Sequence, residues 1–222
     1  MCRVTTTRTV AEEVRNLLDY LLNAEIAAYI NTVSVSGTRV SWHATDPGIP
    51  FLVSRGDPTL QDYRRWARSG AYSALLFDGA LLQITYEIED GEIAGHRLAY
   101  IPCPYRVDSE LVRQDPIIDV IDLHIETEPT NMILHSAIRF DFDPGSAAPG
   151  HPAAHLTINS ADCRIACAAP MRIGRFTDFI FRHFYPDLWK AHLPFFGSSA
   201  TREAGPRTLT PDERNTPHLY WS

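Results

Sequence analysis

Between residues 10 and 30, apolar side chains recur three and four positions apart. Leu17, Leu18 and Leu21 are among them, and this spacing places them on one face of an α-helix. The pattern therefore predicts a long amphipathic helix near the amino terminus. Thr9 or a neighbouring residue supplies the polar side chain that suits its first turn.

After this helix the apolar residues recur at every second position, which is typical of strands. Alternation over residues 32–42 predicts a short hairpin. Alternation over residues 80–89 and again over residues 93–101 flanks Asp90-Gly91, a strong signal for a tight turn. We therefore expect two long antiparallel strands on either side of that turn.

Further elements follow from cap and turn residues. Asp57-Pro58 has the form of a helix start, and Gly70 has the form of a helix end. Residues 116–125 are almost continuously apolar, which favours a strand in the centre of the sheet. The remaining predicted elements are strands over 132–142, 155–159 and 219–221 and a helix over 174–185.

These elements indicate an α+β fold. We expect one large, curved and mostly antiparallel sheet, with the N-terminal helix and the helix at about 174–185 packed on one face. At 222 residues the chain is long enough to bury a substantial core. No repeat or sharp compositional boundary divides residues 1–222, so a single domain is the expectation.

Composition indicates the location and the general partners of the protein more clearly than its chemistry. A formal charge of −7 gives no general attraction to duplex nucleic acid or to an anionic membrane. No apolar run is long enough to cross a bilayer, and the amino terminus lacks the apolar core of a secretion signal. We therefore expect a cytoplasmic protein without a membrane partner, in which the cysteines are free thiols.

The stretch from residue 139 to residue 164 holds an unusual density of charged side chains. On a strand, period two places Arg139, Asp141 and Asp143 on one face. After a short loop, residues 151–155 lead the chain back towards this strand. A histidine stands at each end of the segment, so both imidazoles can approach the face that carries the charged residues. The predicted cluster consists of Arg139, Asp141, His151, His155 and Arg164.

Four further residues are candidates for ligand binding. His96 and Arg97 are adjacent on a predicted strand, so they point to opposite faces, and one of them can face a cleft. Arg64 and Arg65 lie on the second predicted helix beside aromatic residues, where they form either an anion-binding face or an ordinary solvated face.

Three chemistries fit the charged cluster. A divalent metal ion could activate water; a histidine beside an aspartate could transfer a proton while an arginine stabilises an anion; or the arginines could bind a phosphate or carboxylate without any reaction. A purely structural role, in which arginines and aspartates pair with one another, is the alternative. The possible metal ligands are Asp141, Asp143, His151 and His155, and the sequence leaves the cofactor unknown, since it holds no Walker loop or dinucleotide fingerprint.

Five sequence blocks resemble a known family. They are H-R-L-A-Y-I-P-C-P at 96–104, I-R-F-D-F-D-P at 138–144, H-P-A-A-H-L-T-I-N at 151–159, C-R-I at 163–165 and F-T-D-F-I-F-R-H-F-Y at 176–185. Together they resemble a bacterial family catalogued as a domain of unknown function, numbered twenty-two ninety. The resemblance spans nearly the whole chain. It implies a stand-alone cytoplasmic protein encoded among mobile or phage-defence genes.

The family resemblance assigns no residue roles, because no activity is established for the family. One position departs from its pattern, since a proline is associated with the position after C-R-I and this chain has Ala166. Two functions remain open. The first is a phage-defence or toxin-like protein that acts on or recognises nucleic acid or a nucleotide through the Arg/Asp/His cluster. The second is a non-catalytic adaptor for a protein or nucleic-acid partner, for example the product of a neighbouring gene, with the cluster as scaffolding.

Overall fold

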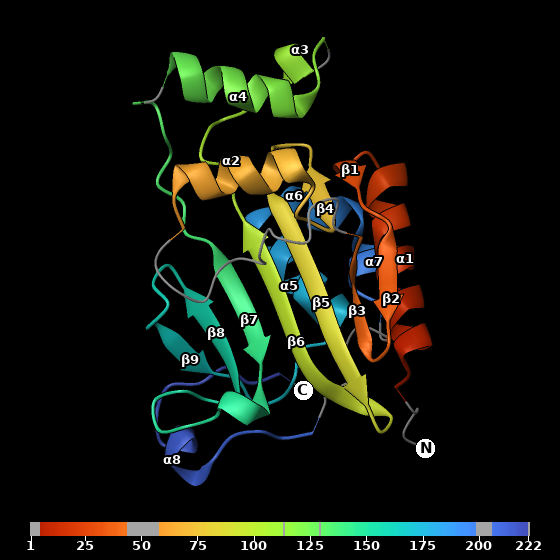
Figure 1. Ribbon diagram of the computed structural model, residues 1–222, viewed down its shortest axis with the longest axis vertical. Helices are drawn as coiled ribbons and strands as arrows, with labels where there is room; N and C mark the ends of the chain where they lie inside the picture. Colours follow the sequence, from red (N-terminus) through yellow and green to blue (C-terminus); the bar gives the residue numbers. More distant parts are fainter. Residues whose placement is uncertain (1–4, 44–57, 113, 129, 199–205, 222) are drawn as a thin grey trace.

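The computed structural model describes residues 5–43, 58–112, 114–128, 130–198 and 206–221 (Figure 1). The helices are α1 (Thr7–Asn23), α2 (Leu60–Ser69), α3 (Ser109–Val112), α4 (Ile117–Thr127), α5 (Ile173–Phe184), α6 (Pro186–Ala191), α7 (Leu193–Phe196) and α8 (Pro211–Arg214), with a 3-10 turn η1 (Pro144–Ser146). The strands are β1 (Ala27–Ile30), β2 (Val33–Ser36), β3 (Arg39–Trp42), β4 (Ala74–Leu76), β5 (Leu81–Glu89), β6 (Glu92–Ile101), β7 (Ile138–Phe142), β8 (Ala154–Ile158) and β9 (Arg164–Ala166).

The strands form one sheet in the order β1-β4-β5-β6-β7-β8-β9, and β3 pairs with both β5 and β2. The pairings between these strands are antiparallel. The long β5–β6 hairpin turns at Asp90-Gly91, where both residues have positive φ. This confirms the hairpin predicted from the Asp-Gly signal.

Helices α1 and α5 pack on the same face of the sheet, as the sequence predicted. Val14 and Leu18 of α1 and Phe176 and Ile180 of α5 belong to one buried cluster with the inward residues of β5 to β8. In Figure 1, α5 lies behind the strands and α1 along their right-hand edge. The α+β class with a mostly antiparallel sheet is therefore confirmed.

Helix α1 is shorter than the predicted helix over residues 10–30. Thr6 caps it, with its side chain accepting a hydrogen bond from the backbone N–H of Thr9. Beyond Asn23, the chain turns at Glu25, which has a φ of 57°. Residues 27–30 then form β1 and pair with β4, so the apolar side chains there fill a strand instead of a last helical turn.

The opposite face of the sheet carries a second, smaller buried cluster under α2 and α4 (Figure 1). The predicted strand over residues 116–125 is wrong, because α4 occupies this segment. Ile117, Ile121 and Ile125 are buried at a spacing of four, whereas Leu123 is about half exposed. Only one face of this apolar run is buried, and a helix meets that requirement.

Helix α2 begins and ends at residues with clear capping roles. Thr59 and Asp62 form a reciprocal capping box, so Thr59 takes the place predicted for Asp57, which lies outside the described residues. Gly70 ends the helix with a φ of 67°, as predicted. Arg64 and Arg68 both form ion pairs with the buried Asp122 of α4, and these contacts hold the two helices together.

Two predicted strands are shorter in the structure. The segment expected over 132–142 is a strand only over the range of β7, and 132–137 has no regular structure. The segment expected over 219–221 contributes a single parallel bridge between Leu219 and Cys167. Among the described helices, none is both long enough and apolar enough to cross a bilayer.

Candidate anion-binding site

Strand β7 separates apolar and charged side chains between the two faces of the sheet. Ile138, Phe140 and Phe142 belong to the main core. Arg139 and Asp141 therefore point to the opposite face, which follows from the period-two pattern. The predicted alternation is confirmed for these five residues.

The charged face continues from β7 onto the neighbouring strands. Residues that lie directly opposite one another on adjacent strands form two rows across the sheet. The first row consists of Thr85, Arg97, Asp141, His155 and Ala166, and the second of Gln83, Ala99, Arg139, Thr157 and Arg164. Neighbours within a row lie on adjacent strands, where side chains interact directly. In Figure 1, none of the described helices lies over the lower half of β6, β7 and β8 on this face.

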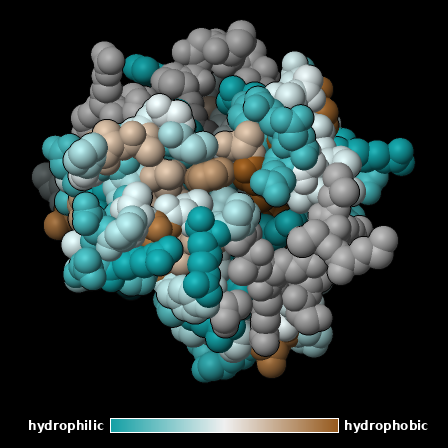
Figure 2. Space-filling view, turned by 90° about the horizontal axis from the view of Figure 1, so that it is seen from below, coloured by the Kyte–Doolittle hydropathy of each residue, from teal (hydrophilic) through white to brown (hydrophobic). Residues whose placement is uncertain are grey.

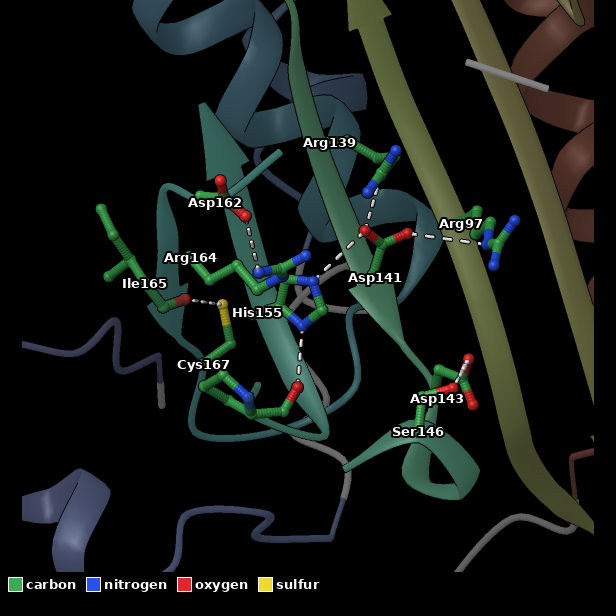
Figure 3. A network of polar contacts seen from close by, with 11 residues as sticks. Arg97, Arg139, Asp141, Asp143, Ser146, His155, Asp162, Arg164, Ile165 and Cys167 are labelled. Atoms are coloured by element: carbon green, nitrogen blue, oxygen red, sulfur yellow. Dashed lines mark hydrogen bonds and ion pairs between the residues drawn. The ribbon is translucent and has the colours of Figure 1, made fainter. Parts of the chain in front are cut away.

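Asp141 lies at the centre of the polar contacts (Figure 3). Its Oδ2 atom accepts a hydrogen bond of 2.5 Å from Nε of Arg139 and lies 3.4 Å from Nε2 of His155. Nε of Arg97 lies 3.8 Å from the other carboxylate oxygen. The side chain of Asp141 is 6% exposed and that of Arg97 is 47% exposed, so the cluster runs from the protein interior to solvent.

The two predicted histidines do converge on this face. Nδ1 of His155 donates to the backbone carbonyl of Pro152 at 2.8 Å, and this bond fixes the orientation of the ring. The rings of His151 and His155 meet edge to face with centroids 5.0 Å apart. Because His155 is only 2% exposed, His151 is the imidazole of the pair that a ligand can reach.

Burial and neighbouring charges shift two pKa values in the cluster. Burial alone would raise the pKa of Asp141, but the His155 hydrogen bond and the Arg139 guanidinium outweigh it and hold that pKa below its ordinary value. The pKa of His151 is lowered by burial first, and then by electrostatic interaction with Arg164 and His155. At pH 7 Asp141 is therefore ionised and His151 is mainly neutral.

Three buried polar atoms on this face have no hydrogen-bond partner within the described residues. They are Oδ1 of Asp141, Oγ1 of Thr157 and Nε of Arg164. Buried polar atoms are nearly always paired in folded proteins. Thr157 was absent from the sequence candidates, although its position two residues after His155 on one strand could have indicated it.

His96, a predicted binding residue, lies on the opposite face of the sheet from Arg97. Its Nε2 atom accepts a hydrogen bond of 2.7 Å from the backbone N–H of Met171, and its ring packs against Tyr86 and Phe142. Complete burial lowers its pKa to about 4. His96 is therefore a neutral core residue, and the alternation along β6 leaves Arg97 on the charged face.

Two other predicted residues, Arg64 and Arg65, lie away from the cluster, whereas Asp143 lies near enough to His151 for its charge to oppose the lowering of that pKa. Arg64 and Arg65 are on α2 above the apolar half of the face, and Arg64 pairs with Asp122 and Glu126 at 2.9 and 2.8 Å. Asp143 accepts a hydrogen bond of 2.8 Å from Ser146 in η1. Within the described residues, no group of three or more His, Cys, Asp or Glu side chains is arranged to hold a metal ion.

Comparison with known proteins places the chain in a family. The profile of the family described as an uncharacterised conserved protein, DUF2290, matches residues 23–221. The chain belongs to this family. Searches of curated proteins and of solved structures return no match. Ala166 is the position at which the sequence blocks depart from the expected proline. It lies in β9, directly opposite His155.

Proposed function

We propose that the charged half of the sheet binds a phosphate-bearing ligand, either a nucleotide or a nucleic acid. The observation that carries the proposal is the row Arg139, Thr157, Arg164 on adjacent strands, in which Oγ1 of Thr157 and Nε of Arg164 have no partner among the described residues. A guanidinium presents its donors in a plane that matches two phosphate oxygens, and a hydroxyl beside it adds a third donor.

Charge in the cluster supports an anionic ligand. Arg97, Arg139 and Arg164 carry three positive charges there, whereas Asp141 is the only carboxylate in the two rows. Asp141 neutralises one of them and fixes the Arg139 side chain by its hydrogen bond. Asp162 lies 3.7 Å from Nη1 of Arg164 with its side chain 97% exposed, so the three arginines face the carboxylates of Asp141 and Asp162 in a chain whose formal charge is −7.

The remaining atoms favour a nucleotide over inorganic phosphate. Oδ1 of Asp141 is an acceptor without a hydrogen-bond partner in the described part of the chain. A ribose hydroxyl or a base amino group can donate to it, whereas the oxygens of a phosphate dianion cannot. His151, mainly neutral and more accessible than His155, can accept a proton from such a hydroxyl, which leaves a reaction open at the same site.

The wider role within this proposal is that of a bacterial, cytoplasmic, phage-defence or toxin-like protein. It follows the expectation drawn from the sequence blocks, and it agrees with an acidic chain that gathers three arginines at one place. Such a role requires the ligand site. Variants that lose ligand binding should therefore lose protection or toxicity when they are expressed in a bacterial host.

Binding is tested with a fluorescein-labelled single-stranded RNA decamer in an anisotropy titration, with inorganic phosphate as competitor. Thr157→Val keeps the size of the side chain and deletes the hydroxyl, and Arg164→Ala deletes the guanidinium. We expect each to weaken binding at least ten-fold, because hydrogen bonds to charged groups contribute about 1.5–3 kcal/mol. Arg8→Ala, in the exposed first turn of α1, is the control. Wild-type affinity in both variants would refute the proposal.

The alternative is an adaptor in which the charged cluster is only scaffolding. The burial of Asp141 among Arg139, Arg97 and His155 favours it, because such a group can exist for stability alone. Thr157→Val and Arg164→Ala separate the two cases, because neither removes the buried carboxylate of Asp141. Lost RNA binding with an unchanged melting temperature in these variants supports a ligand site, whereas retained binding in both, together with lost folding in Asp141→Ala, supports scaffolding.

A further inference from the structure

The segment from residue 206 to residue 221 lies against the end of β9. The backbone N–H of Leu219 donates to the carbonyl of Ala166 at 2.8 Å, and that of Ala168 donates to the carbonyl of Leu219 at 2.9 Å. Thr208 donates through its backbone to Ala168 and through its hydroxyl to Cys167. These bonds fix the C-terminal segment beside the strand that carries Arg164, with α8 below β9 in Figure 1.

A hollow of about 190 Å³ lies between this segment and the end of β9. Among the described residues it is lined by Ala168, Arg207, Leu209, Arg214, His218 and Tyr220, and none of these is a carboxylate. The side chains of Arg207 and Arg214 form no ion pair or hydrogen bond with the described residues. Two arginines therefore line one hollow without a counter-charge from the described part of the chain.

Two polar rings also line the hollow. Nδ1 of His218 donates to the carbonyl of Thr216 at 2.9 Å, because a carbonyl can only accept, so in the neutral ring Nε2 is an acceptor for an N–H or O–H group of a ligand. Tyr220 is 62% exposed. Seen from the end of the molecule where α8 lies, the described surface is largely hydrophilic, with hydrophobic residues in a short band and separate spots (Figure 2).

The size of the hollow limits what it can hold. Pockets for complete small-molecule ligands have volumes of about 300–1,000 Å³. The hollow is smaller, so it fits one anionic group between the arginines. A planar ring attached to that group would lie outside the hollow, where the exposed face of Tyr220 can stack on it.

The hollow lies just beyond the end of the strand that carries the proposed ligand site. Ala168 is four positions after Arg164 and two positions after the last residue of β9, which corresponds to at most about 13 Å of chain at 3.3 Å per residue. Cys167 points into the main core. Ala168, like Ala166, does not belong to that core. A stacked nucleic-acid strand rises about 3.4 Å per nucleotide, so about four nucleotides bridge this distance.

We infer that the ligand is a single-stranded nucleic acid that runs along β9. One phosphate lies at Arg164 and Thr157, another lies between Arg207 and Arg214, and an unpaired base stacks on Tyr220. The inference rests on the proposed function and narrows it from any phosphate-bearing ligand to a strand with at least two phosphates. A single strand is the better match because its unpaired bases expose faces that can stack on a tyrosine along its length, and the acidic chain disfavours a duplex.

The inference is tested by the salt dependence of binding of the labelled single-stranded RNA decamer to the full chain. For single strands, the slope of log K against log salt changes by about 0.7 for each phosphate contact. The double variant Arg207→Ala/Arg214→Ala removes one phosphate contact and should therefore reduce the slope by about 0.7. Tyr220→Ala should weaken binding about five-fold or more, and Tyr220→Phe should restore it, since phenylalanine keeps the stacking face.

The matched control is Arg8→Ala/Arg39→Ala, which removes the same charge from two exposed arginines elsewhere. It should leave the slope close to that of the wild-type chain. An unchanged slope in the hollow variant, together with weak binding by Thr157→Val, would overturn the second contact and leave the proposed function intact. Equal affinity for the duplex decamer would overturn the single-strand assignment. Failure of the wild-type chain to bind any decamer would overturn both.

Discussion

The imidazole of His155 lies beside the carboxylate of Asp141, with Nε2 of the histidine 3.4 Å from Oδ2 of the aspartate. The two residues occupy directly opposed positions on β7 and β8, so the sheet register brings them together. The ring is also held by the carbonyl of Pro152. One backbone contact and one strand pairing thus fix the deepest part of the charged cluster.

Removal of the Asp141 carboxylate should destabilise the fold strongly. In Asp141→Ala the nearly buried guanidinium of Arg139 loses the carboxylate that neutralises it, and a broken buried pair costs about 3–5 kcal/mol. Asp143→Ala is the control, because that carboxylate bonds only to Ser146 in the described chain and should cost less than about 1 kcal/mol. Urea unfolding monitored by circular dichroism measures both values. Similar losses in the two variants would contradict the central role of Asp141.

His96 should make the protein less stable as the pH falls from 6.5 towards 4. Its pKa is lowered from 6.5 to about 4, so in this range the unfolded chain takes up a proton that the folded chain does not. At about 1.4 kcal/mol for each tenfold change in proton affinity, the loss amounts to about 3 kcal/mol. Denaturation curves between pH 4 and 7 measure it.

The variant His96→Leu should flatten this part of the stability profile, even if it lowers stability at every pH through loss of the Met171 hydrogen bond. His183→Leu is the matched control, because His183 lies exposed on α5. A profile for His96→Leu that is as steep as that of the wild-type chain would assign the pH dependence to other groups.

Binding of the RNA decamer should become tighter as the pH falls below 6.5. The pKa of His151 is lowered, so its ring is neutral at pH 7 and gains a positive charge only in more acidic solution. Phosphodiesters do not titrate in this range, and the added charge therefore favours the anion. Anisotropy titrations between pH 5 and 7 should show this change for the wild-type chain and a flat profile for His151→Gln. An equally steep profile in the variant would exclude His151 from the site.

Substitution of Gly79 should disrupt the contact between the sheet and α4. Gly79 has a φ of +88°, and an added Cβ would lie 2.9 Å from Sγ of Cys103 and 3.1 Å from Cδ1 of Ile121. Backbone strain and overpacking together predict a loss of about 2–5 kcal/mol for Gly79→Ala. Gly37→Ala is the control, because it has a similar φ with open space around it, and it should cost about 1–2 kcal/mol. Equal losses would mean that packing plays no part.

Much of the sheet could be predicted because alternation of apolar and polar residues was enough to identify most of its strands. The Asp90-Gly91 turn and the alternation from Ile138 to Phe142 each have one physical solution, and the structure confirms both. The helix α4 could not be predicted from its apolar run. A strand covered on both faces and a helix in contact with one partner both produce such a run, and only the packing of α2 decides between them.

The candidate site was predictable along each strand but not across strands. Period two placed Arg139 and Asp141 together, but the neighbour of each depends on register, which connects residues far apart in sequence. For this reason Thr157 was missed, and His96 could not be distinguished from Arg97. Arg64 gave a misleading signal, because its partner Asp122 lies on a helix that the sequence had predicted as a strand.

The bonds from Leu219 and Thr208 to the end of β9 also affect how separate molecules behave. β9 is the last strand in the order of the sheet, and an outer strand offers free backbone groups to any other chain that can pair with it. The C-terminal segment occupies part of that edge. Deletion of residues 206–221 should therefore promote strand-to-strand association between copies, and a tag fused after residue 222 is safer than a truncation before it.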